Sequence, residues 1–332
     1  MDFKFDFQED YVVKEIIKKK CKKVLLQLPE GLKMEGSRLA NYFENKTSAE
    51  IVVSGEPCWG ACDLALDEAK KLEVDILIHY GHAPFIKRVD FPVLYVEMND
   101  LRSIDKLLNL SLKTLNKYNS LGLVCSVQHK HQLEQAKKFF EDHGKKVIIP
   151  EKKGYAHYDG HVVGCEYNSL KTITNEVDAF VVIGNRFHSL GAAIAVENPV
   201  YLLDIYNNEI IEMSKYKDKI IKQRYAAIEK CKDAKKVGII VGTKPGQKFG
   251  SFKVIKDKFR KLGKEVIVIT MNEINSDKLT NFRDINCFVE LACPRIAIED
   301  YGRYDKTLIT FRESLVVLGD MSWEDLLKNG LI

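Results

Sequence analysis

Three of the eight cysteines, Cys62, Cys165 and Cys293, each follow a segment that reads as a strand and then a loop. They fall in three different stretches of the chain, more than a hundred residues apart. Thiolates are soft ligands that favour iron–sulfur clusters, Zn²⁺ or Cu(I). If the chain repeats at this interval, one thiolate per repeat could bring three ligands around one metal centre. A fourth coordination position would then stay open for a substrate.

Other cofactor motifs are not matched. The sequence lacks the paired Cys-x2-Cys knuckles that are typical of structural zinc. Cys58 and Cys62 have the first spacing of a conventional radical-SAM Cys-x3-Cys-x2-Cys loop, but Ala65 stands where the third cysteine belongs. There is no Gly-x-Gly-x-x-Gly after a strand and no Gly-Lys-Ser/Thr phosphate loop. The glycines of segment 242–247 predict a tight turn.

The remaining cysteines have simpler interpretations. The N-terminal residues do not resemble a secretory signal, so we expect reduced thiols rather than a disulfide framework. Cys125 and Cys287 lie inside apolar runs, which predicts small core residues. Cys21 and Cys231 lie in charged helical stretches, which predicts incidental thiols. Cys58 stays open: it could support a ligand, replace one, or have no role.

The elements that must position these cysteines recur along the chain. Short apolar runs end in polar or Gly/Pro loops, and a helical pattern follows the first run of each third. The runs are 22–31, 50–54, 74–80 and 91–97, then 121–129, 146–150, 177–184 and 199–204, then 235–247, 264–270, 285–292 and 314–319, and the helical patterns are 33–44, 131–143 and 251–262.

Such runs alternating with helices predict βαβ units and parallel sheets. The period predicts an α/β protein of three similar repeated domains, 1–106, 107–218 and 219–332, each with a mainly four-stranded parallel sheet, around a central site.

Composition agrees with a globular protein of several domains. The 332 residues exceed what one core usually supports, and 45% of them are hydrophobic and 30% charged. The apolar runs are too short to span a bilayer, and the acidic N-terminus does not resemble a signal peptide. The net charge of +4 is small and its two signs are interleaved, so no nucleic-acid partner is expected. We expect a cytoplasmic location and no membrane partner.

Five short motifs, spread over all three predicted domains, together resemble a known family. They are Leu-Gln-Leu-Pro-Glu-Gly-Leu (26–32), Gly-Ala-Cys-Asp (60–63), Ile-His-Tyr-Gly-His-Ala (78–83), Gly-Thr-Lys-Pro-Gly-Gln (242–247) and Ala-Cys-Pro-Arg (292–295). In this combination the chain resembles diphthamide synthase, and more narrowly its archaeal Dph2-type form. The resemblance covers essentially the whole chain.

That resemblance implies a specific activity. In the family one cysteine per domain holds a [4Fe-4S] cluster, and these match Cys62, Cys165 and Cys293. The fourth iron is open for S-adenosylmethionine, whose 3-amino-3-carboxypropyl group is transferred to a histidine of translation elongation factor 2 with release of methylthioadenosine. The cofactor carries the hard chemistry, and the protein must orient the substrate and exclude competing reactions. Archaeal members work as homodimers, and the electron donor is not identified by the sequence.

Polar residues near strand ends are further candidates. We expect some of them to bind the methionine amino and carboxylate groups, where arginine offers a bidentate fork, and a histidine could act as a general base. The cofactor-binding candidates are Gln27, Glu30, Gln247, Arg295 and Asp300, and the histidine candidates are His82 and His188, with His79 beside them. The alternative for each is loop capping or hydrogen bonding between domains. Trp323 is interpreted as a core residue.

Two other functions fit part of the pattern. Quinolinate synthase is also a threefold α/β protein that holds a [4Fe-4S] cluster by three cysteines, and it would explain the repeat without S-adenosylmethionine. A cluster-free interaction subunit with a degenerate site belongs to a different class. Retention of all three matched cysteines argues against the interaction subunit, and the five motifs argue against quinolinate synthase.

Overall fold

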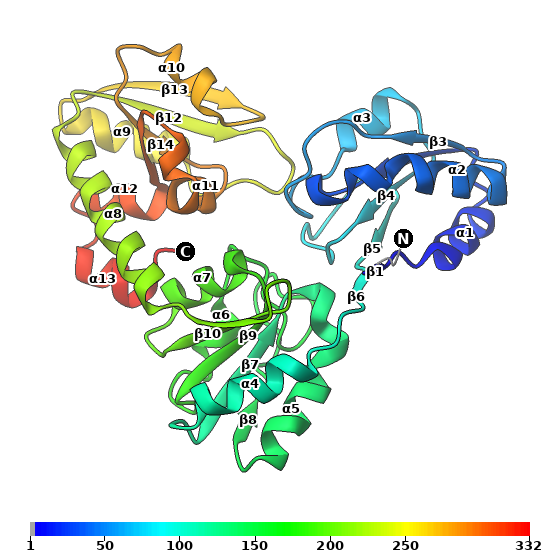
Figure 1. The fold of residues 1–332 in the computed structure, drawn as a ribbon. Coiled ribbons are helices and arrows are strands. Elements are labelled where there is room, and N and C mark those ends of the chain that lie inside the picture. The colour runs from blue at the N-terminus through cyan, green and yellow to red at the C-terminus, as the bar shows by residue number, and fades with distance from the viewer. Residues whose placement is uncertain (1–3) are drawn as a thin grey trace.

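Three parallel sheets, one in each third of the chain, form the framework of the protein (Figure 1). The computed structural model describes residues 4–332, so the first three residues of the predicted N-terminal segment lie outside the described residues. In each sheet the first strand lies between the second and the third, and the fourth flanks the third. We call the residues around these sheets the first, second and third units. The predicted α/β protein with several parallel sheets is confirmed.

The first unit contains the sheet β3-β2-β4-β5, whose strands all pair in parallel. A short antiparallel pair, β1 with β6, lies beside it and was not predicted. The elements are β1 (Phe5–Asp6), α1 (Glu9–Lys18), β2 (Lys23–Gln27), the 3₁₀ helix η1 (Glu30–Glu35), α2 (Gly36–Thr47), β3 (Glu50–Val53), α3 (Leu66–Lys71), β4 (Ile76–Tyr80), β5 (Val93–Val96) and β6 (Asn99–Asp100).

The second unit contains the sheet β8-β7-β9-β10, extended at one edge by the antiparallel strand β11, which was also not predicted. Its elements are α4 (Asp105–Leu115), β7 (Ser120–Cys125), η2 (Val127–Gln132), α5 (Leu133–Asp142), β8 (Lys146–Ile148), α6 (Asn168–Lys171), β9 (Ala179–Gly184), α7 (Arg186–Ala195), β10 (Val200–Asp204) and β11 (Glu209–Glu212).

The third unit contains the sheet β13-β12-β14-β15, and the long helix α8 leads into it from the second unit (Figure 1). Its elements are α8 (Ser214–Asp233), β12 (Lys236–Gly242), α9 (Phe252–Lys261), β13 (Glu265–Met271), α10 (Ser276–Thr280), β14 (Cys287–Glu290), α11 (Pro294–Glu299), η3 (Tyr301–Arg303), β15 (Thr307–Thr310), α12 (Phe311–Val317) and α13 (Trp323–Asn329).

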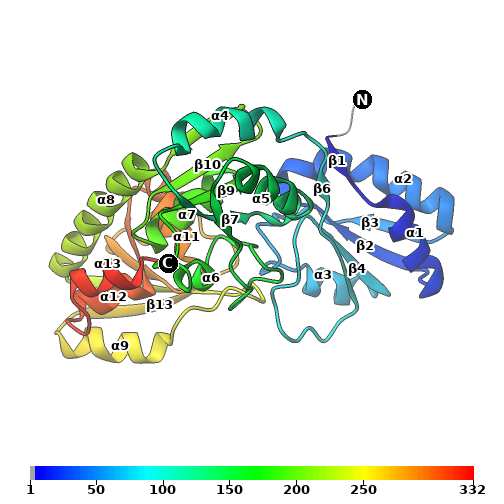
Figure 2. The ribbon, with the colours of Figure 1, turned by 90° about the horizontal axis from the view of Figure 1, so that it is seen from below.

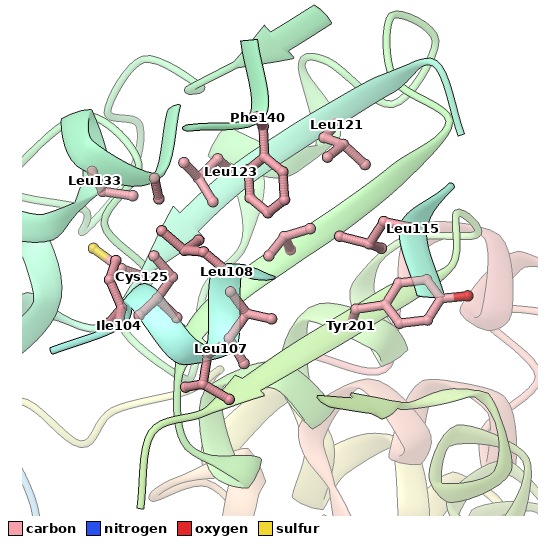
Figure 3. Close-up of a cluster of buried hydrophobic side chains, with 14 of the residues drawn as sticks. Ile104, Leu107, Leu108, Leu115, Leu121, Leu123, Cys125, Leu133, Phe140 and Tyr201 are labelled. Carbon is pink, nitrogen blue, oxygen red and sulfur yellow. The ribbon is translucent and has the colours of Figure 1, made fainter. Parts of the chain in front are cut away.

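Each sheet is covered on both faces, which explains why its central strands read as continuous apolar runs. In β9, Ala179, Val181 and Ile183 face the core beneath α4 and α5, whereas Phe180 and Val182 face α6 and α7. Figure 3 shows part of the first of these cores, and Figure 2 shows α4 and α5 on the same side of the second unit. Cys125 lies buried in this core with a free thiol, as predicted.

The predicted fourth strand of the third unit is wrong. Residues 314–319 lie in α12 and the turn that follows it, and the fourth strand is β15. Thr310 ends β15 and caps α12, because its hydroxyl accepts the Glu313 N–H while the Glu313 carboxylate accepts the Thr310 N–H. The Thr-x-x-Glu sequence that signals this capping box precedes the apolar run. The run is therefore the buried face of a helix.

The prediction of reduced, incidental thiols is wrong for Cys231, which forms a disulfide with Cys287. Cys231 lies on the buried face of α8, one to three turns after Ile220, Arg224 and Ile228, although its sequence neighbours are charged. Helix α8 packs against β14, and the Cα atoms of the two cysteines are 5.5 Å apart. Cys287 is a core residue as predicted, but it is not a free one.

None of the helices within residues 4–332 combines the length and the apolar character needed to cross a bilayer.

Candidate metal centre

A cavity of about 850 Å³ lies where the three units meet, and Cys62, Cys165 and Cys293 all line it. Cys62 lies in the loop after β3 and Cys165 in the loop after β8. Cys293 follows β14 and is the N-cap residue of α11. These loops leave the carboxyl ends of parallel strands, where α/β proteins bind ligands. The structure therefore brings the three predicted thiols to one site.

The three thiols are free and mostly removed from water. Burial, with a smaller contribution from the nearby Cys62, raises the pKa of Cys165 to about 12. Burial also raises the pKa of Cys62 and of Cys293, and both other thiols add to the effect at Cys293. Three neighbouring thiolates would repel one another in this setting, so the thiols stay protonated unless a metal cation replaces their protons.

Cys62 is held by the loop that follows β12 in the third unit. The Gly246 N–H donates to the Cys62 carbonyl at 2.8 Å, and Gln247 Nε2 lies 3.7 Å from Cys62 Sγ. A Cβ atom added to Gly246 would lie 2.6 Å from the Cys62 Cα. This glycine therefore allows two backbones from different units to touch, which a turn within the third unit would not require.

We expect Gly246→Ala to displace the Cys62 loop and to lower the metal content of the purified protein. Because the clash is with backbone atoms rather than a flexible side chain, the structure must shift, and overpacking of this kind costs about 1–3 kcal/mol of stability. Gly302→Ala is the matched control, since no atom lies within 4 Å of its added Cβ. Thermal unfolding and bound iron, measured on both variants, test this. Equal iron in the two variants would contradict it.

A buried ion-pair network joins the same two units next to Cys62. Lys244 Nζ lies 2.5 Å from Asp63 Oδ2 and also contacts Glu273. The Trp59 indole N–H donates to Glu273 at 3.1 Å. Lys244 is almost fully buried, so both carboxylates are needed to compensate its charge. The network fixes the loop that carries Cys62 against the third unit.

Arg295 links the other two thiol loops. Its guanidinium donates to the Gly164 carbonyl at 2.9 Å and to the Phe187 carbonyl at 2.5 Å, and it lies 3.9 Å from the centre of the Phe187 ring. It also pairs with Glu299. Gly164 directly precedes Cys165, and Arg295 follows Cys293 by two residues. Arg295 thus sets the position of both loops. Among the described residues, none bonds its buried Nε.

Glu290 holds the backbone at Cys293. Its carboxyl group accepts hydrogen bonds from the Ala292 N–H at 3.0 Å and the Cys293 N–H at 2.9 Å. Burial raises its pKa well above the usual range. Glu290 is the last residue of β14, so the strand end itself shapes the loop that presents Cys293.

Gln27 and two histidines support the Cys62 loop from behind. Gln27 Nε2 donates to the Asp63 carbonyl at 2.7 Å, and its Oε1 accepts the Ala65 N–H at 3.2 Å. His79 Nδ1 lies 2.8 Å from Gln27 Oε1, and His79 Nε2 lies 3.0 Å from His82 Nδ1. Burial lowers the pKa of His79 well below its usual value and that of His82 to about 4. Both rings are therefore neutral at pH 7.

The structure divides the other predicted site residues into two groups. His82, His188, Gln247, Arg295 and Asp300 line the cavity. Gln27 and Glu30 are not among its lining residues: Gln27 supports the Cys62 loop, and Glu30 pairs with Lys33 at 2.7 Å and accepts the Cys58 N–H at 3.3 Å.

His188 occupies the first turn of α7. Its Nδ1 lies 2.9 Å from the Oδ1 atom of Asn185, and burial lowers its pKa to about 3. Trp323 lies elsewhere, packed against Tyr225 and the core of the third unit. The sequence analysis missed Lys244, Asp63, Glu273 and Glu290. The signal that could have identified these four residues is their charge, because each lies within or directly after an apolar run or in the loop that follows one.

The three α/β units close around a cavity that is lined by three free thiols. The fold and the cavity therefore define the class: an α/β protein with a candidate metal centre whose ligands are cysteines. A family model for putative diphthamide synthesis proteins matches residues 28–327, and the chain belongs to this family.

Relatives of known name agree. The chain is 34% identical to a 2-(3-amino-3-carboxypropyl)histidine synthase of Pyrococcus horikoshii, over 93% of this chain and 89% of that protein. It is 31% identical to subunit 1 of the Schizosaccharomyces pombe synthase, over 97% of this chain and 75% of that one. It also resembles the crystal structure of Dph2 from Pyrococcus horikoshii with a 4Fe-4S cluster, with a TM-score of 0.86, 32% identity, and coverage of 96% and 92% of the two chains.

Proposed function

We propose that this protein is a 2-(3-amino-3-carboxypropyl)histidine synthase that carries out the first step of diphthamide biosynthesis. It transfers the 3-amino-3-carboxypropyl group of S-adenosylmethionine to a histidine of translation elongation factor 2. The observation that carries the proposal is the meeting of Cys62, Cys165 and Cys293 in one cavity. The names of the relatives above support it.

The donor set fits a [4Fe-4S] cluster. Three thiols supply three of the four ligands that such a cluster needs, and one iron is left for substrate. The cavity has room for a substrate beside the cluster, at about 850 Å³. When bound, the cluster supplies the electron that cleaves the bond from the sulfonium to the methionine Cγ. We assign Cys62, Cys165 and Cys293 as its ligands.

The residues of the chain then bind and orient the substrate. Arg295 and Gln247 line the cavity near two of the thiols and are our candidates for holding the methionine carboxylate and amino groups, with Asp300 further along the wall. The Arg295 Nε is buried and no described residue bonds it, so its N–H is one donor that the chain leaves unused. His82 and His188 are neutral at pH 7, because burial lowers their pKa values to about 4 and about 3. Either ring can accept the proton that the modified imidazole loses.

The test is the identity of the products. With dithionite, S-adenosylmethionine and elongation factor 2, we expect methylthioadenosine and a factor that carries the aminocarboxypropyl group on one histidine. Chromatography of the nucleosides and mass analysis of the factor measure both. Dominant 5′-deoxyadenosine would indicate a conventional radical-SAM reaction and would overturn the mechanism. Quinolinate formed from iminoaspartate and dihydroxyacetone phosphate would overturn the function.

We further propose that the three units are repeats of one domain, with boundaries at 1–106, 107–218 and 219–332. The shared strand order supports this. We place the protein in the cytoplasm with its substrate factor, where an unidentified donor supplies electrons.

We also expect a homodimer, by analogy with the archaeal members of the family. Sedimentation at micromolar concentration should therefore give twice the chain mass of 38.0 kDa. The alternative is a monomer, because the three thiols already meet within one chain. A single species of monomer mass across the concentration range would contradict the dimer.

A further inference from the structure

We propose that Cys58, His79 and His82 form a second metal site, distinct from the three-cysteine centre, that takes a divalent ion such as Zn²⁺. One ligand atom from each residue lies within 4.8 Å of the others. One thiolate and two imidazoles are a donor set that suits Zn²⁺. The proposed function assigns no metal to this set. Only His82 has a part in it, as one of two candidate bases, and a His82 that binds the ion leaves that part to His188.

The three donors lie in the interior of the first unit. Cys58 is 2% exposed and His79 is fully buried, while the His82 ring reaches the cavity wall. Neither Cys58 nor His79 is among the residues that line the cavity. The second site is therefore behind the wall on which Cys62 lies, and His82 is the side chain shared by the two places.

The orientation of His79 is fixed as in known zinc sites. Gln27 donates through its amide nitrogen to one backbone carbonyl and accepts at Oε1 from one backbone N–H, so its amide cannot be reversed without losing both bonds. His79 must then carry its proton on Nδ1, which donates to Oε1. The lone pair of His79 lies on Nε2 and is directed toward His82. Zinc-bound histidines are oriented in this way by an oxygen acceptor on the far nitrogen.

The backbone that carries Cys58 is also fixed. Glu30 accepts the Cys58 N–H at 3.3 Å, and Lys33 Nζ donates to the carbonyls of Gly55 and Glu56 at 2.8 and 2.6 Å. Glu30 and Lys33 pair with each other, so η1 holds the loop from one side. A restrained loop presents a thiol to the histidines at a lower entropic cost than a free one.

Binding replaces a hydrogen bond that the two rings now make. His79 Nε2 and His82 Nδ1 are 3.0 Å apart, which is already close enough for two ligands of one ion. His82 now donates its Nδ1 proton to His79 Nε2, so on binding that proton moves to His82 Nε2 and frees the Nδ1 lone pair for the ion. The ion then takes one lone pair from each ring, and the Cys58 thiol releases its proton to solvent. Tetrahedral Zn²⁺ draws its donor atoms to within roughly 4 Å of one another, so Cys58 has only a short way to move. The fourth ligand is a water molecule, which reaches the ion from the cavity that His82 lines.

The first experiment measures metals in the protein with its cluster assembled. We expect one equivalent of zinc per chain in addition to iron, and we expect Cys58→Ala to lose the zinc and keep the iron. Cys125→Ala, a free buried cysteine outside both sites, should keep both metals. Zinc absent from the wild type after incubation with zinc would overturn the proposal. Loss of iron without any zinc in Cys58→Ala would overturn it too, because Cys58 would then belong to the cluster.

A second experiment isolates the site. In the full-length chain with Cys62→Ala, Cys165→Ala and Cys293→Ala combined, Co²⁺ should bind at one equivalent. It should show the visible absorption of tetrahedral cobalt and one thiolate charge-transfer band. Adding Cys58→Ala should abolish that band. Cobalt that binds without the charge-transfer band, or not at all, in a chain that circular dichroism shows to be folded, would exclude Cys58 as a ligand.

Discussion

Replacing Cys62, Cys165 or Cys293 singly with alanine is expected to remove most of the bound iron and abolish transfer activity. Each thiol comes from a different unit, and the structure offers no spare free thiol among the residues that line the cavity. With only two thiolates, two irons of the cluster would lack a protein ligand, and we expect the cluster to be lost. Stability of the metal-free chain should change little, because these side chains face a cavity rather than a packed core. Iron and sulfide analysis after anaerobic reconstitution measures the effect.

Cys125→Ala is the matched control and should give the opposite pattern. Its thiol is buried among Ile104, Leu133 and other apolar side chains of the second unit, away from the cavity (Figure 3). Removing it leaves a small void, which costs on the order of 1 kcal/mol in unfolding free energy, but iron should be retained. Normal iron content in any of the three cavity variants would remove that cysteine from the ligand set.

The central strands could be predicted because of how they are buried. Both faces of each sheet are covered, so β2, β7, β9 and β12 are uninterrupted apolar runs that end at turn residues. The two wrong predictions come from the same assumption, that a buried element can be recognised by an apolar run in the sequence. The run at 314–319 is also apolar, but a capping box before it makes it a helix, and burial on one face of α8 was hidden by charged neighbours of Cys231. A local apolar run does not distinguish a strand from the inner face of a helix.

Of the candidate site, the sequence predicted the three thiols that meet in the cavity but not the contacts that position them. A cysteine in a loop is recognisable from its residue type as a possible metal ligand. The contacts that position these cysteines, in contrast, join residues far apart in the sequence. Gly246 touches Cys62, and Arg295 bonds the carbonyl of Gly164. From the sequence, the glycine predicts a turn and the arginine predicts a substrate-binding residue. Their roles between units follow only from the packing of the three sheets around one cavity.

A buried ion pair ties α8, the helix that leads into the third unit, to the rest of that unit. Arg224 is 1% exposed and donates to both carboxylate oxygens of Glu313, at 2.6 and 2.7 Å. It also donates to the carbonyls of Ala297 and Leu308 at 2.6 Å. One guanidinium therefore ties the connecting helix to α11, β15 and α12. Cys293 is the N-cap residue of α11, so this pair lies one helix away from the candidate metal centre.

Glu313→Leu or Arg224→Leu alone is expected to destabilise the protein by about 3–5 kcal/mol, because each change leaves an uncompensated polar or charged partner in the interior. Glu313→Leu also removes the cap of α12. The double variant should be more stable than the sum of the two single changes predicts, since both partners are then apolar. Urea unfolding monitored by circular dichroism and by iron loss measures this. We expect iron to be released at lower urea in each single variant.

Asp320→Ala is the control that separates burial from charge. It breaks the ion pair between Asp320 and Lys258, whose side chains are 35% and 40% exposed. Exposed pairs contribute about 0–1 kcal/mol, so the unfolding midpoint should hardly move. If Glu313→Leu were no more harmful than Asp320→Ala, the connection of α8 to the third unit would not depend on this pair. The position of Cys293 would then have to be maintained by Glu290 and Arg295 alone.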